Sequence, residues 1–141
     1  MTPQNVFVVD DADFMVDMLR LILEEGGHRV VGSAADGIRA VEQLREVVSR
    51  SLTVDVVLVD LYMPKRDGFE TVREIRAILP DVKVLLVTAN ATLPVALKAK
   101  ELGIDGFIVK PFEPETLLEA LRKIIFRRSD KFRFCHYYVF G

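Results

Sequence analysis

The chain has 141 residues, half of them apolar, which suits one domain with a sizeable core. Its formal net charge of -2 predicts no direct binding to nucleic acid or to an anionic membrane surface. A single cysteine, Cys135, excludes an intrachain disulfide and favours a reducing compartment. The start lacks the pattern of a secretory signal, and no apolar run approaches the roughly 20 residues that span a bilayer. We therefore expect a soluble, cytoplasmic protein without a membrane contact.

The first third of the chain alternates between extended and helical patterns. Residues 6–9 form a short apolar run that predicts a strand. From Phe14 the apolar residues recur at helical spacing until Gly26, which starts a glycine pair that ends the pattern. Residues 29–33 predict a second, shorter strand. Asp36 is expected to cap the amphipathic helix that follows.

The middle of the chain contains a dense run of β-branched and aliphatic residues at 54–60, which predicts a strand buried on both faces. Asp67, with Glu70 three positions later, resembles a capping box, so a helix should begin there. Pro80 should end this helix because proline cannot continue it. Residues 82–87 then predict a fourth strand, which is also buried.

The last third begins with an alanine-rich segment at 93–102 that predicts a lightly packed helix, and Gly103 suits a left-handed cap after it. Residues 106–109 predict a fifth strand. Pro114 opens a last amphipathic helix that continues to Ile125. Five strands thus alternate with five helices, which requires parallel strands, right-handed crossovers and helices on both faces of the sheet. The predicted fold is a doubly wound α/β domain.

Side chains that can carry chemistry stand at the carboxyl ends of four predicted strands: Asp10, Asp11, Asp60, Thr88 and Lys110. In an open parallel sheet such ends meet at one edge, where ligands bind. Two carboxylates about 4 Å apart repel each other by about 4 kcal/mol at an effective dielectric near 20, so the cluster demands a cation. Mg²⁺ suits such oxygen ligands and leaves a coordination position for a phosphoryl oxygen, to which Thr88 and Lys110 would add a donor and a charge. A carboxylate can itself be the nucleophile and form an aspartyl phosphate.

Four short motifs mark these strand ends. They are Asp10-Asp11, Asp60 with Met63-Pro64 and Gly68, Thr88-Ala89, and Lys110-Pro111-Phe112. Each is weak alone, but in this order, between about Val6 and about Phe126, they resemble the receiver domain of two-component response regulators. The resemblance implies a single flavodoxin-like (CheY-like) domain with five parallel strands in the order 2-1-3-4-5 and five helices. It also implies a signalling switch rather than an enzyme, one that catalyses only its own phosphorylation and autodephosphorylation.

The resemblance also implies a role for each acid. Asp60 would accept a phosphoryl group from a histidine kinase or a histidine phosphotransfer protein. Asp11 and Asp60 would bind Mg²⁺ directly, together with the backbone carbonyl of Tyr62. Asp10 would act on the ion mostly through water.

Further roles follow from the same resemblance. Thr88 would turn toward the phosphoryl group, and Lys110, whose bond to the next proline is expected to be cis, would pair with it. Phe107 stands at the aromatic switch position but has no hydroxyl to donate. Tyr62 and Asn90 would border the path of the attacking water and so set the phosphate lifetime. The signal would leave through the face of the fourth helix, fifth strand and fifth helix, to a downstream protein or a second copy of the chain.

Two other functions stay open at this point. Asp11-Ala12-Asp13 offers the paired acids of a haloacid-dehalogenase-like phosphatase, although the chain is too short for the usual cap domain of that family. Alternatively, the chain is a degenerate receiver used as a phosphate-independent binding module. All of the acceptor-site residues are present, which favours a phosphorylated switch.

The domain organisation is expected to be a receiver over residues 1–127 and an aromatic-rich tail over residues 128–141. The tail alternates like a strand in its first half. We favour a linker or a truncated or vector-derived segment over a docking strand, because nine such residues would need a partner surface to become ordered in water. His28 and His136 are both expected to be solvated and far from any metal site.

Overall fold

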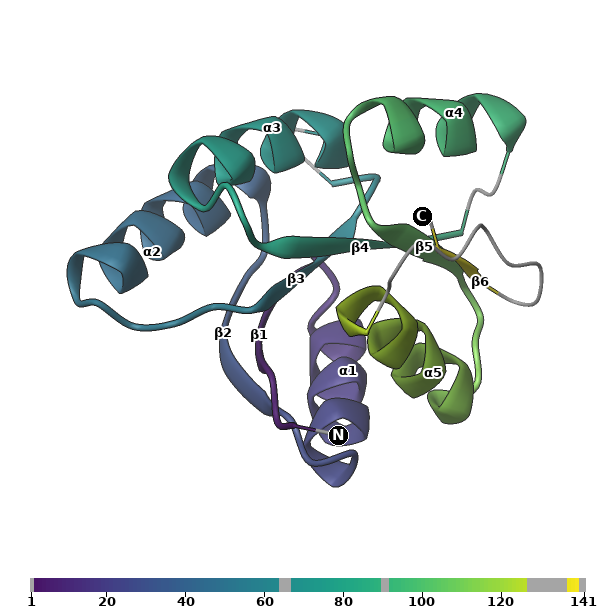
Figure 1. Cartoon of the computed structure of the whole chain (residues 1–141), viewed down its shortest axis with the longest axis horizontal. Helices are drawn as coiled ribbons and strands as arrows, with labels where there is room; N and C mark the ends of the chain where they lie inside the picture. Colours follow the sequence, from purple (N-terminus) through teal and green to yellow (C-terminus); the bar gives the residue numbers. More distant parts are fainter. Residues whose placement is uncertain (1, 64–66, 90–91, 127–136, 140–141) are drawn as a thin grey trace.

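The computed structural model describes residues 2–63, 67–89, 92–126 and 137–139 (Figure 1). The elements, in chain order, are β1 (Asn5–Val9), α1 (Asp13–Glu25), β2 (Arg29–Ala34), α2 (Gly37–Ser49), β3 (Val56–Asp60), α3 (Gly68–Ile78), β4 (Lys83–Thr88), α4 (Leu93–Glu101), β5 (Gly106–Val109), α5 (Pro114–Ile125) and β6 (Tyr137–Val139). The alternation of strands and helices predicted from the sequence is therefore present from β1 to α5.

The first five strands pair in parallel in the predicted order β2-β1-β3-β4-β5. Helices α1 and α5 cover one face of the sheet, and α2, α3 and α4 cover the other (Figure 1). Each face has its own apolar core, and all residues of β3 are buried, as expected for a central strand that is covered on both sides. Among the described helices, none is long and apolar enough to span a membrane.

The helix ends follow the local signals in the sequence. The Asp36 carboxylate accepts a hydrogen bond from the backbone N–H of Arg39 at 2.8 Å, and the Asp67 carboxylate accepts one from Glu70 at 2.8 Å. Each satisfies a backbone donor that the first turn of a helix leaves without a partner. Gly103 follows α4 with a φ of 73°, a left-handed conformation that glycine adopts without a steric penalty.

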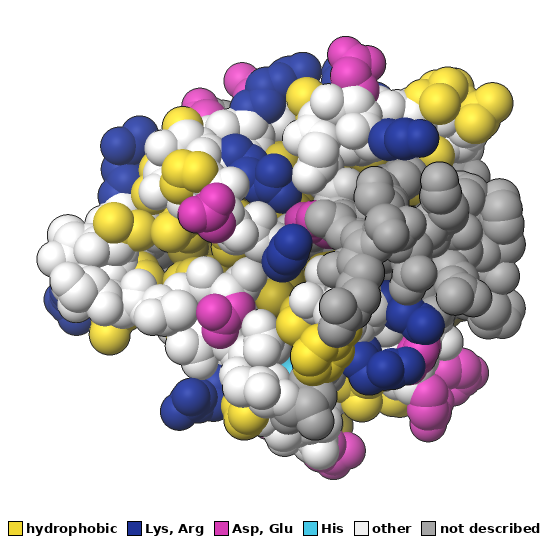
Figure 2. Space-filling model, in the orientation of Figure 1, with side chains coloured by type: hydrophobic (Ala, Val, Ile, Leu, Met, Phe, Trp, Pro, Cys, Tyr) yellow, Lys and Arg dark blue, Asp and Glu magenta, His cyan; other side chains and the backbone are white. Residues whose placement is uncertain are grey.

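Helix α4 is attached to the sheet by little apolar surface. Of its residues only Ala99 is buried, whereas Leu93 and Leu97 are 69% and 58% exposed. Figure 2 shows hydrophobic side chains at the surface in the region of α4. The prediction of a lightly packed helix is confirmed.

The sheet has a sixth strand that the sequence analysis did not place. Strand β6 pairs antiparallel with β5 and forms the edge of the sheet. The alternating pattern noted in the first half of the tail lies outside the described residues, and the described strand is in the second half. The role of the tail stays a prediction.

The expectation for His28 is wrong. This side chain is only 4% exposed, and its Nδ1 accepts a hydrogen bond from the backbone N–H of Gln4 at 3.0 Å. Burial lowers the pKa of the imidazole, because a charged ring would lose its hydration. The hydrogen bond joins the turn after α1 to the start of β1, a tertiary contact that a lone histidine in the sequence does not reveal. His136 lies outside the described residues.

Candidate functional site

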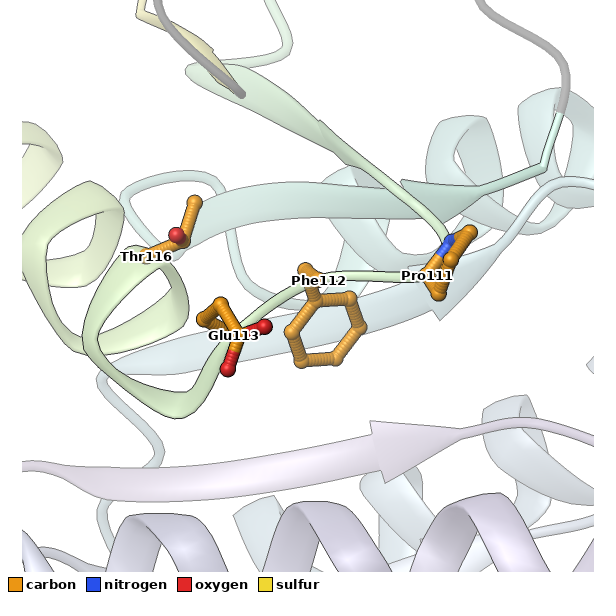
Figure 3. A pocket seen from close by; sticks show the side chains of 4 residues that line it. All are labelled: Pro111, Phe112, Glu113 and Thr116. Atoms are coloured by element: carbon orange, nitrogen blue, oxygen red, sulfur yellow. The ribbon is translucent and has the colours of Figure 1, made fainter.

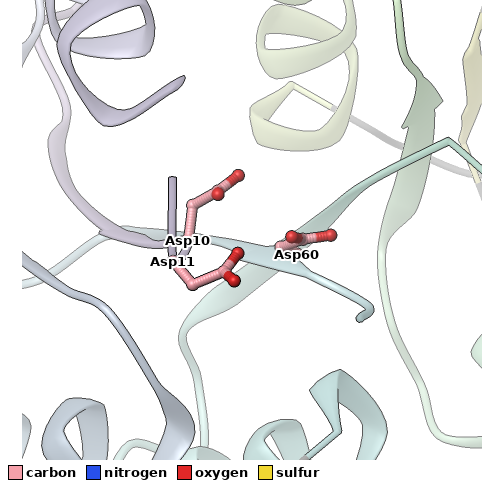
Figure 4. A group of neighbouring side chains, drawn as sticks. All are labelled: Asp10, Asp11 and Asp60. Atoms are coloured by element: carbon pink, nitrogen blue, oxygen red, sulfur yellow. The ribbon is translucent and has the colours of Figure 1, made fainter. Parts of the chain in front are cut away.

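Three carboxylates meet where β1 and β3 end, because these two strands are neighbours in the sheet. Asp10 and Asp11 directly follow β1, and Asp60 is the last residue of β3. One carboxylate oxygen from each residue lies within 4.8 Å of the others (Figure 4). Asp10 and Asp60 are buried, whereas Asp11 is exposed. The convergence predicted from the sequence is therefore present in the structure.

Lys110 brings a positive charge to two of these acids. Its Nζ lies 3.2 Å from Oδ2 of Asp10 and 3.7 Å from Oδ2 of Asp60. The lysine follows β5, which is separated from β3 by β4, so its long side chain crosses the end of β4 to reach Asp60. The bond from Lys110 to Pro111 is cis, as expected. Lys110 thus offsets part of the repulsion among the carboxylates.

The environment of Asp60 raises the pKa of its carboxyl group above the ordinary value. Burial is the largest cause, and the charges of Asp10 and Asp11 act in the same direction. The charge of Lys110 opposes them, as does a hydrogen bond of 3.3 Å from the backbone N–H of Tyr62 to Oδ1 of Asp60. Because the raising effects prevail, the ionised form of Asp60 is destabilised, and a bound cation would relieve this.

Asp10 is held from both ends of its carboxylate. Oδ1 accepts a hydrogen bond from the backbone N–H of Ala12 at 2.9 Å, while Oδ2 pairs with Lys110. Asp11, in contrast, has an exposed carboxylate at the same edge. This difference favours Asp11 and Asp60 as direct ligands of an ion and Asp10 as an indirect one, which stays a prediction.

The donor set fits Mg²⁺. Oxygens of three carboxylates within 4.8 Å of one another are hard ligands, and their mutual repulsion favours a small divalent cation. The backbone carbonyl of Tyr62 belongs to the residue that directs its N–H at Asp60, but its part in ion binding stays a prediction.

The predicted switch residues lie on β4 and β5. Thr88 ends β4 and is fully buried, and its backbone carbonyl accepts a hydrogen bond from the N–H of Lys110 at 2.8 Å. Phe107 is 1% exposed and packs in the core on the α2–α3–α4 face of the sheet. Tyr62 is 55% exposed beside the acids, and Asn90 lies outside the described residues. The structure therefore shows Phe107 in its buried arrangement.

Gly68 packs closely against the backbone of Asp60 and Leu61. Its backbone N–H donates to the carbonyl of Leu61 at 2.8 Å, and a Cβ atom at Gly68 would lie 2.6 Å from the carbonyl oxygen of Asp60. It would also lie 2.8 Å from the Cα of Leu61. Since these are backbone atoms, no side chain can move away to make room, and only glycine permits this close contact between the start of α3 and the end of β3.

We expect Gly68→Ala to lower the unfolding free energy by about 1–3 kcal/mol, the usual cost of overpacking, and to displace Asp60. Urea unfolding would measure the first effect, and the shift of the Asp60 backbone amide in an NMR spectrum the second. Arg73→Ala, at an exposed position of α3, is the matched control and should change neither by much. Equal urea midpoints for Gly68→Ala and wild type would contradict the argument.

A second charged cluster, at the opposite end of β5, was not predicted from the sequence. The buried carboxylate of Asp105 accepts hydrogen bonds from the backbone N–H of Val84 at 2.8 Å and from Arg76 at 3.1 Å. It ties the start of β5 to β4 and α3.

A pocket of about 250 Å³ follows Lys110 in the chain, between the end of β5 and the start of α5. Its lining consists of Pro111, Phe112, Glu113 and Thr116 (Figure 3). Glu113 is the only ionisable side chain among these residues. The pocket therefore has a partly apolar lining, and none of the three clustered carboxylates contributes to it.

The sequence and the fold match known proteins over most of the chain. The response regulator receiver domain family matches residues 6–122. Chemotaxis protein CheY of Thermotoga maritima is 37% identical over 121 residues, which cover 86% of this chain and 97% of that protein. Protein CcdB of Bacillus subtilis is 39% identical over the same shares of the two chains. The crystal structure of the CheX–CheY–BeF3–Mg complex from Borrelia burgdorferi has a TM-score of 0.82 at 28% identity, covering 89% of this chain and 91% of that one. This chain belongs to the response regulator receiver domain family of two-component signalling.

Proposed function

We propose that this receiver is a phosphorylation-dependent switch in which Asp60 accepts a phosphoryl group from a phosphohistidine. The donor would be a histidine kinase or a histidine phosphotransfer protein. A carboxylate oxygen of Asp60 attacks phosphorus, the bond from phosphorus to the imidazole nitrogen breaks, and the electron pair returns to the imidazole. The observation that carries the proposal is the convergence of Asp10, Asp11 and Lys110 on Asp60.

Asp11 and Asp60 would hold Mg²⁺, with the backbone carbonyl of Tyr62 as a third protein ligand and Asp10 acting through water. When bound, the ion neutralises the carboxylate cluster and the charge that develops on the phosphoryl oxygens. Lys110 already lies near the Asp60 oxygen that would carry the group, at 3.7 Å, so a small movement lets its ammonium pair with a phosphoryl oxygen. The hydroxyl of Thr88 would donate to another.

The protein would catalyse this transfer and the later hydrolysis of its own aspartyl phosphate, and no other turnover. Tyr62 is exposed next to Asp60, where its ring can restrict the attacking water, and Asn90 is proposed to border the same path. Membership of the receiver family counts against a haloacid-dehalogenase-like phosphatase, because that reading rested on Asp11 and Asp13 alone. A degenerate receiver is disfavoured because every acceptor-site residue is present and Asp10, Asp11 and Lys110 all lie close to Asp60.

The partners follow from the family. CheY-like receivers interact with kinases and with downstream proteins, and we propose that this chain does so through two different surfaces. The carboxylate edge receives the donor. The face of α4, β5 and α5 passes the signal to a downstream protein or to a second copy of the chain.

Incubation with acetyl phosphate and Mg²⁺ should add one phosphoryl group, seen by intact-protein mass spectrometry and removed by hydroxylamine as an acyl phosphate. Asp60→Asn should remove this label completely, since an amide is not a nucleophile for phosphorus. Asp81→Asn, an exposed carboxylate far from the cluster in sequence, is the matched control and should be labelled like the wild type. Label that persists in Asp60→Asn would place the acceptor elsewhere.

A further inference from the structure

Strand β6 occupies the edge of the sheet that β5 would otherwise expose. Three residues of the tail pair with three of the four residues of β5, in the register Gly106 with Val139, Phe107 with Tyr138 and Ile108 with Tyr137. In Figure 1 this strand lies next to β5, on the side of the sheet where α4 and α5 flank it. The chain thus adds its own C-terminal strand to the face proposed for output.

The edge of a sheet is a surface that binds extended backbone segments. It presents backbone N–H and C=O groups at regular spacing, which pair with any extended segment that can lie alongside. A strand as short as β6 makes few such hydrogen bonds, and short edge segments open at a low free energy compared with the core. The pairing of β6 is therefore well suited to reversible release.

Strand β5 itself connects this edge to the carboxylate site. Val109, the last residue of β5, pairs with Thr88, and the next residue, Lys110, donates its backbone N–H to the Thr88 carbonyl. The side chain of Lys110 contacts both Asp10 and Asp60. The other end of β5 is fixed to β4 and α3 through Asp105. A displacement of Lys110 therefore acts on the part of β5 that contains Phe107. Through Phe107 it also acts on the paired residue of β6, Tyr138.

We propose that the β5 edge is a strand-binding surface whose resident occupant is Tyr137–Val139, and that a phosphoryl group on Asp60 weakens this pairing. The inference rests on the proposed function of Asp60. In the structure, docking of β6 occurs together with Lys110 paired to two carboxylates. A phosphoryl group draws Lys110 toward its own oxygens, and the displacement acts on the end of β5 next to Lys110, because the other end is held through Asp105. The tail then acts as an internal competitor for the output face.

Two tail variants of the full chain test this. In an antiparallel pair, consecutive residues direct their N–H groups alternately toward and away from the partner strand. The double variant Tyr138→Pro with Val139→Pro therefore removes one N–H that is directed at β5, whichever of the two residues donates it. Replacing both with threonine keeps the two N–H groups and the strand propensity, and it serves as the matched control. Amide hydrogen exchange of β5 and β6 and titration with beryllium fluoride and Mg²⁺ are measured for all three proteins.

We expect beryllium fluoride to speed exchange of the β6 amides in the wild type and in the threonine variant by about fivefold or more, the lower range of allosteric coupling. Because coupling is reciprocal, the proline variant should bind beryllium fluoride more tightly by the same factor. Binding at Asp60 with unchanged β6 exchange and equal affinity in the proline variant overturns this inference alone. If beryllium fluoride and Mg²⁺ leave the NMR signals of Asp10, Asp11 and Asp60 unchanged, the proposed function is overturned, and this inference with it.

Discussion

Asp60→Asn is expected to raise the unfolding free energy of the metal-free protein at neutral pH, although Asp60 is a buried polar residue. Burial and the neighbouring acids raise the pKa of Asp60, so the folded state holds a proton at a pH where the unfolded chain, with a pKa near 3.8, has lost it. The stability of the wild type therefore falls as pH rises from about 3.8 through the folded pKa. Asparagine does not titrate, so the higher unfolding free energy of Asp60→Asn should be present at pH values above the folded pKa of Asp60. It should vanish at pH values below about 3.8.

Mg²⁺ should reverse the order of stability. A ligand that binds only the folded state at 100 times its dissociation constant stabilises it by about 2.7 kcal/mol. The wild type and Asp81→Asn should gain this stability, whereas Asp60→Asn should not. Asp11→Ala should also lose the gain while its metal-free stability changes little or rises, because its side chain is exposed and only repulsion is removed.

Urea unfolding with EDTA and with Mg²⁺, at several pH values, measures all of these effects. A marked loss of metal-free stability in Asp11→Ala would mean that the acid has a structural role. Stabilisation of Asp60→Asn by Mg²⁺ equal to that of the wild type would show that the ion binds without Asp60.

The sheet and the carboxylate cluster could be predicted from the sequence because their signals are local. The apolar run before Asp60 fixes where β3 ends, and the run before Asp10 does the same for β1. Parallel strands then bring the two ends together without any knowledge of side-chain positions. Asp67 and Gly103 act on the turns next to them, so their cap functions were also predictable.

Contacts between distant segments could not be predicted in this way. Lys110 pairs with Asp10 across 100 residues, and nothing near either residue in the sequence indicates which acid the lysine prefers. The buried side chain of His28 is bonded to Gln4, and that of Asp105 to Arg76 and β4. A strand of three residues such as β6 is too short for a periodic signal, and only the open edge of β5 gives it a position.

Thr88→Ala is expected to weaken the response to phosphorylation more than Phe107→Leu does. To change an equilibrium from about 1:99 to about 99:1, the phosphoryl group needs about 5.5 kcal/mol of differential binding. Phe107 has no hydroxyl, so its preference for the buried arrangement comes from apolar burial, about 2 kcal/mol at most, and leucine keeps much of that. The proposed contacts of Thr88 and Lys110 with the phosphoryl group must therefore supply most of the coupling.

The position of Thr88 supports the larger role given to it than to Phe107. It is fully buried at the end of β4, and its carbonyl binds the backbone of Lys110, so a movement toward Asp60 affects β5 directly. Backbone amide shifts of β5 and α5, with and without beryllium fluoride and Mg²⁺, measure the response. Thr88→Ser is the matched control, because serine and alanine both lack the methyl group and only serine keeps the hydroxyl. Thr88→Ser should respond like the wild type and Thr88→Ala should lose most of the shift. A greater loss in Phe107→Leu than in Thr88→Ala would show instead that packing of the aromatic ring, and not the phosphoryl contacts, drives the change at β5.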